Sequence, residues 1–141
     1  PMRKSTPLAA AILSTMASVV ALAGPATAGP AASVIVPEQL QITITPLSNT
    51  PGLPSGPVSA LLTCDPVGGS HRYAERACAD LEAAKGDIAA VAPQPGAACL
   101  AVWRPVQISV TGRWRGQAID FSQTQPEISC ARVSHGYIFM I

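Results

Sequence analysis

YAERACADLEAAK, residues 73–85, decides the fold class, because it is the clearest helical signal in the chain. Small and apolar residues fall at helical spacing along one side of this stretch: Ala74, Ala77, Cys78, Leu81 and Ala84. The other side carries charged residues, which we expect to face water: Glu75, Arg76, Asp80 and Glu82. Gly86 then provides a stop signal. The pattern predicts one amphipathic helix that packs its cysteine-bearing face against another layer.

Segments on both sides of this helix show the period-2 alternation of half-buried strands. Apolar residues alternate with polar ones at Leu40, Ile42 and Ile44, and again at Val106, Ile108 and Val110. We expect further strands at 58–64, at 114–121 with a bulge near Ile119, and at 137–141, with turns at 67–72 and 111–112 and a polar loop at 123–126. The sequence therefore predicts an α+β fold: an antiparallel sheet of about five strands with one main helix, and room for a second short one, on one face.

The N-terminal stretch has the layout of a secretory signal. Arg3 and Lys4 precede an apolar run over 8–22, and Gly24-Pro25 then leads to the small residues at 26–28. An uncleaved membrane anchor is the alternative, but the run is shorter than the roughly 20 residues of a membrane span. We therefore expect residues 1–28 to be a signal peptide and residues 29–141 to be one secreted domain.

The charge of residues 29–141 excludes two classes of partner. Without Arg3 and Lys4, seven of the nine basic side chains remain against eight acidic ones, a net charge of −1. No run of basic residues is left to attract nucleic acid or a membrane surface. We expect neither as a partner.

Four cysteines, Cys64, Cys78, Cys99 and Cys130, all lie in the predicted domain. An even number in an exported chain indicates disulfides, and four cysteines allow three pairings. The local pairing, Cys64 with Cys78 and Cys99 with Cys130, closes loops of modest size. A zinc site would need close pairs of ligands, which these spacings do not offer. We expect no metal and no cofactor.

The sequence gives little support to an enzyme. His71 and His135 are its only histidines, and both lie in predicted loops. There is no nucleophile elbow, zinc-binding helix or phosphate-binding loop. We expect both histidines to be solvated polar residues without a catalytic role.

The segment GAACLAVWRP, residues 96–105, combines an apolar centre with the sequence signals of an exposed loop. Cys99 would anchor it, and Pro105 favours extended geometry at Arg104. Proteases bind their substrates as extended strands, so a tethered loop of this kind suits a protease cleft. Alternatively, Val102 and Trp103 begin a core strand. The spacing alone does not decide between the two.

Several motifs resemble the Streptomyces subtilisin inhibitor family. They are PEQLQI at 37–42, LLTCDP at 61–66, ACADL at 77–81 with GDI at 86–88, CLAVWRPV at 99–106, VTGRWRG at 110–116, and Cys130 followed by His135-Gly136. The resemblance covers nearly all of residues 37–141. It implies a secreted serine protease inhibitor, and not an enzyme, that blocks its target with a substrate-like loop.

The resemblance also implies particular residues and partners. It places the scissile bond between Ala101 and Val102, with Cys99, Leu100, Trp103 and Arg104 as the flanks. It implies the disulfides Cys64–Cys78 and Cys99–Cys130. It further implies a homodimer formed through the sheet, with Trp114 either at that surface or in the core.

Three positions depart from the family pattern. Ala101 is small and uncharged where Met, Lys or Arg is more common, so we expect subtilisin-like or elastase-like partners and not trypsin-like ones. Leu100 replaces a frequent Pro, and Ile128 replaces an Asn that braces the loop. Both changes predict a less rigid loop and weaker inhibition. The alternative function is a secreted, non-inhibitory binding module on the same fold.

Overall fold

The computed structural model describes residues 24, 29, 37–49, 51 and 53–141. The chain divides into two units, Pro1–Val34 and Ile35–Ile141, and only two glycines of the first unit are described. Apart from Gly24, the predicted signal peptide therefore lies outside the described residues.

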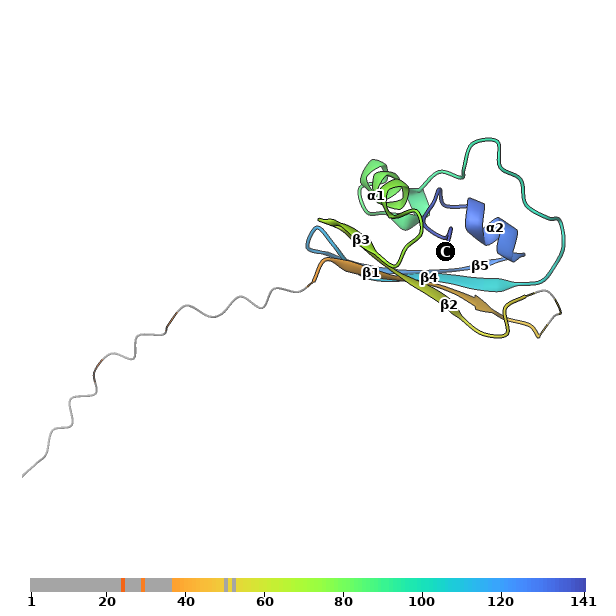
Figure 1. The fold of residues 1–141 in the computed structure, drawn as a ribbon, viewed down its shortest axis with the longest axis horizontal. Helices are drawn as coiled ribbons and strands as arrows, with labels where there is room; N and C mark the ends of the chain where they lie inside the picture. Colours follow the sequence, from red (N-terminus) through yellow and green to blue (C-terminus); the bar gives the residue numbers. More distant parts are fainter. Residues whose placement is uncertain (1–23, 25–28, 30–36, 50, 52) are drawn as a thin grey trace, which may run out of the picture. The chain divides into compact units, whose positions relative to one another are not determined.

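Five antiparallel strands form the sheet, in the order β3-β2-β1-β4-β5 (Figure 1). They are β1 Gln39–Pro46, β2 Val58–Cys64, β3 Val67–Gly69, β4 Val106–Trp114 and β5 Gln117–Gln125. The alternation seen in the sequence places Leu40, Ile42 and Ile44 on the buried face of β1, beside Val110 and Ile108 of β4. The polar residues between them form the opposite face of the sheet.

Two helices cover the buried face of the sheet (Figure 1). The longer, α1 (Ala74–Ala83), contacts β2 and β3, while α2 (Ile128–Val133) contacts β4 and β5. A short 3-10 turn, η1 (Ile88–Ala90), follows α1. The predicted α+β fold, with one main helix and a second short one on one face, is confirmed.

Helix α1 uses the face that the sequence predicts. Ala77 and Leu81 are buried, and Cys78 bonds to Cys64 at the end of β2 with a Cα–Cα distance of 5.6 Å. Gly86 has a φ of +82°, and a Cβ there would lie 2.6 Å from the Trp114 ring. Glycine therefore ends the helix and lets the indole pack closely against the backbone.

The hairpin between β4 and β5 differs from the prediction. Gly112 does not turn the chain. It pairs with Leu40 inside the sheet, where its φ of +139° suits a strand that approaches its neighbour closely. The chain reverses instead at Arg115-Gly116. Because Trp114 ends β4 and does not begin β5, the register of β5 is continuous and needs no bulge near Ile119.

Three other segments also differ from the prediction. Residues 123–125 continue β5, since their backbone pairs with β4 although their side chains are mainly polar. The glycine-rich segment 67–69 is a short edge strand and not a turn. Residues 137–141 form no strand. The apolar side chains of Ile138 and Phe139 are buried in the core instead, and the C-terminus lies between the two helices (Figure 1).

Candidate functional site

Residues 92–105 connect η1 to β4 without forming a helix or a strand. Among the described residues, six large apolar side chains are exposed, and three of them, Leu100, Val102 and Trp103, lie in this loop. Trp103 is 74% exposed. The core strand begins only at Val106, so Val102 and Trp103 do not begin it. Of the two alternatives left by the sequence, the structure shows the exposed loop.

A disulfide and a hydrogen bond anchor the N-terminal side of this loop. Cys99 bonds to Cys130 of α2, with their Cα atoms 4.7 Å apart, and Cys130 itself is buried. One residue further on, the Leu100 amide donates to Ser129 Oγ at 3.0 Å. Both disulfides implied by the family resemblance are therefore present.

Backbone hydrogen bonds anchor the C-terminal side. The Arg104 amide donates to the Pro126 carbonyl at 2.8 Å, and the Pro105 carbonyl accepts from the Leu47 amide at 3.0 Å. Between the two anchors, Ala101 and Val102 make no hydrogen bond to any other described residue. The loop therefore presents a short segment with free backbone groups, held at both ends.

Glu127 contacts one residue of each anchor, Ser129 on the N-terminal side and Arg104 on the C-terminal side. The residue is only 2% exposed; its carboxylate pairs with the Arg104 guanidinium at 3.3 Å and accepts hydrogen bonds from the amide and hydroxyl of Ser129. Burial alone would raise the pKa of Glu127, but the Ser129 hydrogen bonds and the Arg104 charge outweigh it and lower this pKa below its ordinary value. Glu127 is therefore held as a buried carboxylate anion.

Sequence analysis missed Glu127 and Ser129. The signal was weak, because Glu127 is the N-cap of α2 whereas the usual N-cap residues are Ser, Thr, Asp and Asn. Ile128 stands where the family has a bracing Asn, and the weaker inhibition expected from that change stays a prediction. Ile128 packs against the core, and the residues on either side of it make the contacts to the loop.

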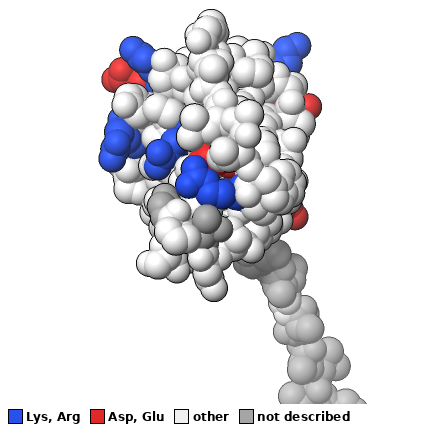
Figure 2. Space-filling model, turned by 90° about the vertical axis from the view of Figure 1, so that its right-hand side faces the viewer, with Lys and Arg blue, Asp and Glu red and all other residues white. Residues whose placement is uncertain are grey.

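The end of the domain that carries the loop is largely uncharged. Figure 2 faces this end, and uncharged residues make up most of the surface that it shows. Several Lys or Arg side chains also lie on this face, near its centre and on one side (Figure 2).

Both histidines are buried, contrary to the prediction that they are solvated. His71 accepts from the Tyr73 amide at Nδ1, and its Nε2 lies 2.9 Å from the Ile138 carbonyl. The ring of His135 packs edge-on against Phe121 and Phe139. Burial lowers the pKa of both imidazoles, which are therefore neutral core residues.

His135 also contacts a neighbouring hydroxyl, Ser134 Oγ, at 2.7 Å. This pair resembles part of a hydrolytic site only superficially, because the imidazole packs among aromatic rings of the core and does not line an open cleft.

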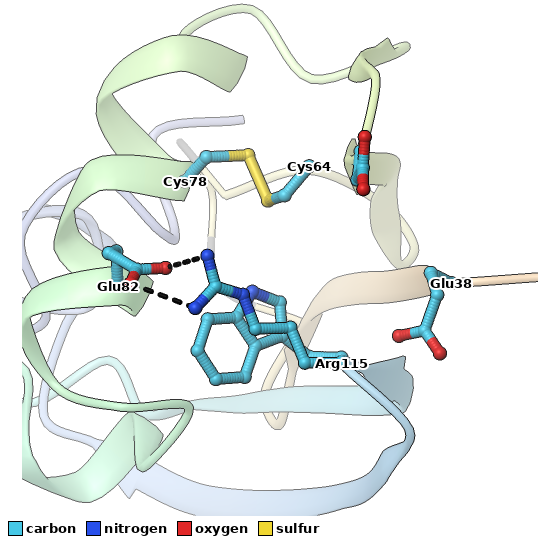
Figure 3. Close-up of a pocket in the computed structure, with 7 residues that line it drawn as sticks. Glu38, Cys64, Cys78, Glu82 and Arg115 are labelled. Carbon is cyan, nitrogen blue, oxygen red and sulfur yellow. Dashed lines mark hydrogen bonds and ion pairs between the residues drawn. A yellow bond between two sulfur atoms is a disulfide. The ribbon is translucent and has the colours of Figure 1, made fainter.

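A cavity of about 290 Å³ lies next to the other disulfide (Figure 3). It is lined by Glu38, Cys64, Asp65, Cys78, Glu82, Trp114 and Arg115. Arg115 closes one side through its ion pair with Glu82, and its guanidinium stacks over the Trp114 ring. Trp114 was expected either at the dimer surface or in the core, and the structure places it in the hydrophobic core.

Two other kinds of feature are not found in the described part of the chain. It holds no cluster of histidine, cysteine and acidic side chains that could bind a metal ion. None of its helices has the length and apolar character needed to cross a bilayer.

Comparison with known proteins agrees with this structure. Residues 37–127 match the family model described as subtilisin inhibitor-like. A subtilase-type protease inhibitor of Streptomyces coelicolor is 36% identical over 105 residues, which are 73% of this chain and 70% of that protein. A trypsin inhibitor of Streptomyces longisporus is 33% identical over 141 residues, 96% of each chain.

Two further matches cover less of the chain. Subtilisin inhibitor-like protein 1 of Streptomyces cacaoi is 47% identical over 66 residues, 45% of this chain and 60% of that protein. In a crystal structure of Streptomyces caespitosus sermetstatin with Bacillus licheniformis subtilisin, one chain matches with a TM-score of 0.48 and 20% identity, over 68% of this chain and 89% of its own length. The family match and the identity to full-length relatives show that this chain belongs to the subtilisin inhibitor-like family, whose members are protease inhibitors and not enzymes.

Proposed function

We propose that this protein is a secreted inhibitor of subtilisin-like serine proteases and that its Ala101–Val102 bond occupies the protease active site. The observation that carries the proposal is the exposed segment 100–103, apolar in composition and anchored on both sides. Relatives named as inhibitors favour this function over a non-inhibitory binding module on the same fold.

Binding would use the backbone groups that the loop leaves free. An extended segment pairs with the edge of a protease cleft through main-chain hydrogen bonds, while its side chains fill the pockets. The anchors at Cys99 and Arg104 reduce the conformational entropy that the segment loses when it binds. An interface of standard size buries about 1,600 Å² in total.

Inhibition follows if the cut bond re-forms faster than water completes its hydrolysis. The protease serine oxygen would form an ester with the Ala101 carbonyl carbon, and the C–N bond to Val102 would break as its nitrogen takes a proton. Attack by the Val102 amine on that ester re-forms the peptide bond and frees the serine. Attack by water instead leaves a carboxylate on Ala101. Holding Val102 in place favours the first outcome.

The residue before the bond sets the target. Ala101 is small and carries no charge for an acidic specificity pocket, so the proposed targets are subtilisin-like and elastase-like proteases. The Streptomyces longisporus relative, which is named as a trypsin inhibitor, would differ from this chain in target.

Secretion and assembly belong to the same proposal. The N-terminal layout of residues 1–28 supports export of the domain by a signal peptide. The sheet face opposite the described helices would form the homodimer, and its polar pairs Thr43–Ser59 and Gln107–Ser122 suit a reversible association. Light scattering of the purified domain over a concentration series would give a dimer mass, whereas a monomer mass throughout would contradict this part.

Titration of subtilisin tests the inhibitory function. Residual activity should fall linearly to zero at a fixed molar ratio of inhibitor to enzyme. If micromolar protein leaves subtilisin and elastase fully active, the inhibitory function is wrong. Ala101→Met then tests the binding module: restored inhibition would show that the loop is still presented, and continued inactivity would favour the non-inhibitory module.

A further inference from the structure

We propose that Glu127 is a positioning residue that holds both flanks of the Ala101–Val102 bond and so sets how readily the cut bond re-forms. This inference rests on the proposed function. It concerns a side chain whose polar partners are Ser129 and Arg104, and not the residues of the bond itself.

Glu127 reaches each flank through one chain of contacts, called an arm here, and the first arm runs through Ser129. The Ser129 hydroxyl donates to the Glu127 carboxylate, so its oxygen is free to accept from the Leu100 amide at 3.0 Å. The carboxylate therefore fixes the orientation of the hydroxyl, and the hydroxyl fixes the backbone one residue before Ala101. This arm holds the acyl side of the bond, which the Cys99–Cys130 disulfide also ties to α2.

The second arm runs through Arg104. Its guanidinium pairs with Glu127 at 3.3 Å, and its Nε is buried without a hydrogen-bond partner among the described residues. Glu127 is thus the partner that holds this side chain in place. The Arg104 amide bonds to the Pro126 carbonyl, the residue directly before Glu127. This arm holds the amine side of the bond, two residues after Val102.

The two flanks differ in what holds them after cleavage. The end at Ala101 stays covalently tied through Cys99, whereas the end at Val102 is tied nearby only by the contacts of Arg104 and Pro105. The amine must stay within reach of the ester for the bond to re-form. The Arg104–Glu127 pair should therefore affect the balance between cut and intact chain more than the Ser129 contact does.

Burial makes Glu127 suited to this role. The carboxylate side chain is 3% exposed, while Arg104 is 28% exposed, so the pair is shielded from solvent on its acidic side. Ion pairs of this kind are costly to break from one side, because they leave a buried charge without a partner. The remote Arg115–Glu82 pair is 66% and 54% exposed and offers a matched control.

The experiment measures the equilibrium ratio of cut to intact chain. Intact and pre-cut domain are each incubated with a trace of subtilisin until the two samples agree, and the ratio is read by chromatography and mass spectrometry. We expect Arg104→Met and Glu127→Gln each to raise the ratio roughly 10-fold, and Ser129→Ala roughly 3-fold. Because the Arg104 side chain acts through Glu127, Arg104→Met combined with Glu127→Gln should raise the ratio no further than Glu127→Gln alone. Arg115→Met should leave the ratio unchanged.

Two comparisons separate positioning from a structural role. Glu127→Asp keeps the charge and an N-cap for α2 but is one methylene shorter, so it should retain the melting temperature of the wild type and still raise the ratio. Arg104→Met and Ser129→Ala leave Glu127 in place as the cap, and they carry the test even if Glu127→Gln does not fold. A lower melting temperature with an unchanged ratio would assign Glu127 a structural role only and overturn the inference.

The outcomes also separate this inference from the proposed function. If the wild type inhibits subtilisin and is cut at Ala101–Val102, but the Arg104 and Glu127 variants keep its ratio within twofold, the inference alone is wrong. If the wild type neither inhibits nor is cut at that bond, the proposed function is wrong and the role of Glu127 falls with it.

Discussion

The two disulfides lie in regions with opposite surroundings. Cys64–Cys78 joins β2 to α1, at the edge of the core and beside Trp114. Cys99–Cys130 joins the buried Cys130 of α2 to an exposed loop, in which Trp103 is the most exposed large apolar side chain of the described residues. The first bridge binds together elements that already pack on each other. The second holds an apolar segment away from the core. There the segment contributes little to the stability of the fold but is available to contact a partner.

The sharpest way to test this contrast is to remove one aromatic ring from each region. Phe139 is fully buried, and Phe139→Ala should lower the free energy of unfolding by about 3–5 kcal/mol because it leaves a cavity. Trp103→Ala should change it by less than about 0.5 kcal/mol, since the ring lies mainly in solvent. Urea unfolding measures both values. A comparable loss in the two variants would show that Trp103 contributes to the core.

Inhibition should respond in the opposite sense. Under conditions where both variants are folded, Trp103→Ala should weaken subtilisin inhibition, and Phe139→Ala should leave it near the wild-type value. Weaker inhibition in the Phe139 variant alone would contradict the division between core and loop.

Removing the disulfides one at a time gives the next largest effect. Replacing either pair by serines should cost about 2–4 kcal/mol of stability, because each bridge closes a loop, of 14 or 31 residues, in the unfolded chain. Only loss of Cys99–Cys130 should make the loop a rapidly hydrolysed substrate. Unfolding measurements and the rate of subtilisin cleavage check the two parts. Equal cleavage rates in the two variants would count against the special role of the loop disulfide.

How far the sequence predicts this molecule depends on whether neighbouring or distant residues decide each feature. The alternation in β1 and β4 and the amphipathic face of α1 are local patterns, and the structure confirms them. In the apolar run 137–141, Ile138 and Phe139 are buried by tertiary packing without forming a strand, and the local composition does not distinguish the two cases. The polar residues 123–125 join β5 because β4 offers backbone partners, which no local pattern records.

The candidate site divides in the same way. Cys99, Leu100 and Trp103 stand out as a tethered apolar segment, and the structure shows them exposed and anchored. Glu127 and Ser129 lie more than 20 residues further along the chain, and they reach the loop only once α2 has folded against the sheet. Their contact with the loop depends on tertiary structure, which the sequence pattern did not supply.

A charge at the residue before the bond should sharpen the functional side of the comparison. Ala101 is exposed, so Ala101→Lys should leave stability within about 0.5 kcal/mol of the wild type. It should improve trypsin inhibition about 100-fold, since lysine pairs with the acid in the trypsin specificity pocket. Inhibition constants for trypsin and subtilisin measure the change. An unchanged constant for trypsin would indicate that Ala101 does not enter the pocket.

The smallest expected effect is a dependence of the core on pH. In the unfolded chain His71 and His135 titrate near their ordinary pKa of 6.5, and burial lowers the pKa of both in the folded chain. The unfolded chain therefore binds protons more readily, and stability should be fully present above about pH 6.5 and fall as the pH drops below it. Urea unfolding between about pH 7.5 and 5.5 checks this. His71→Gln with His135→Gln should remove the dependence, and a slope that persists in this double variant would assign it to other groups.

Limited digestion with subtilisin, followed by mass spectrometry of the products, tests the central claim most directly. The tethered loop of residues 92–105 should be cut once, between Ala101 and Val102, while the rest of the domain resists and the two parts stay joined by Cys99–Cys130. Cleavage that begins at another bond, or that proceeds through several sites of the folded domain, would contradict the account.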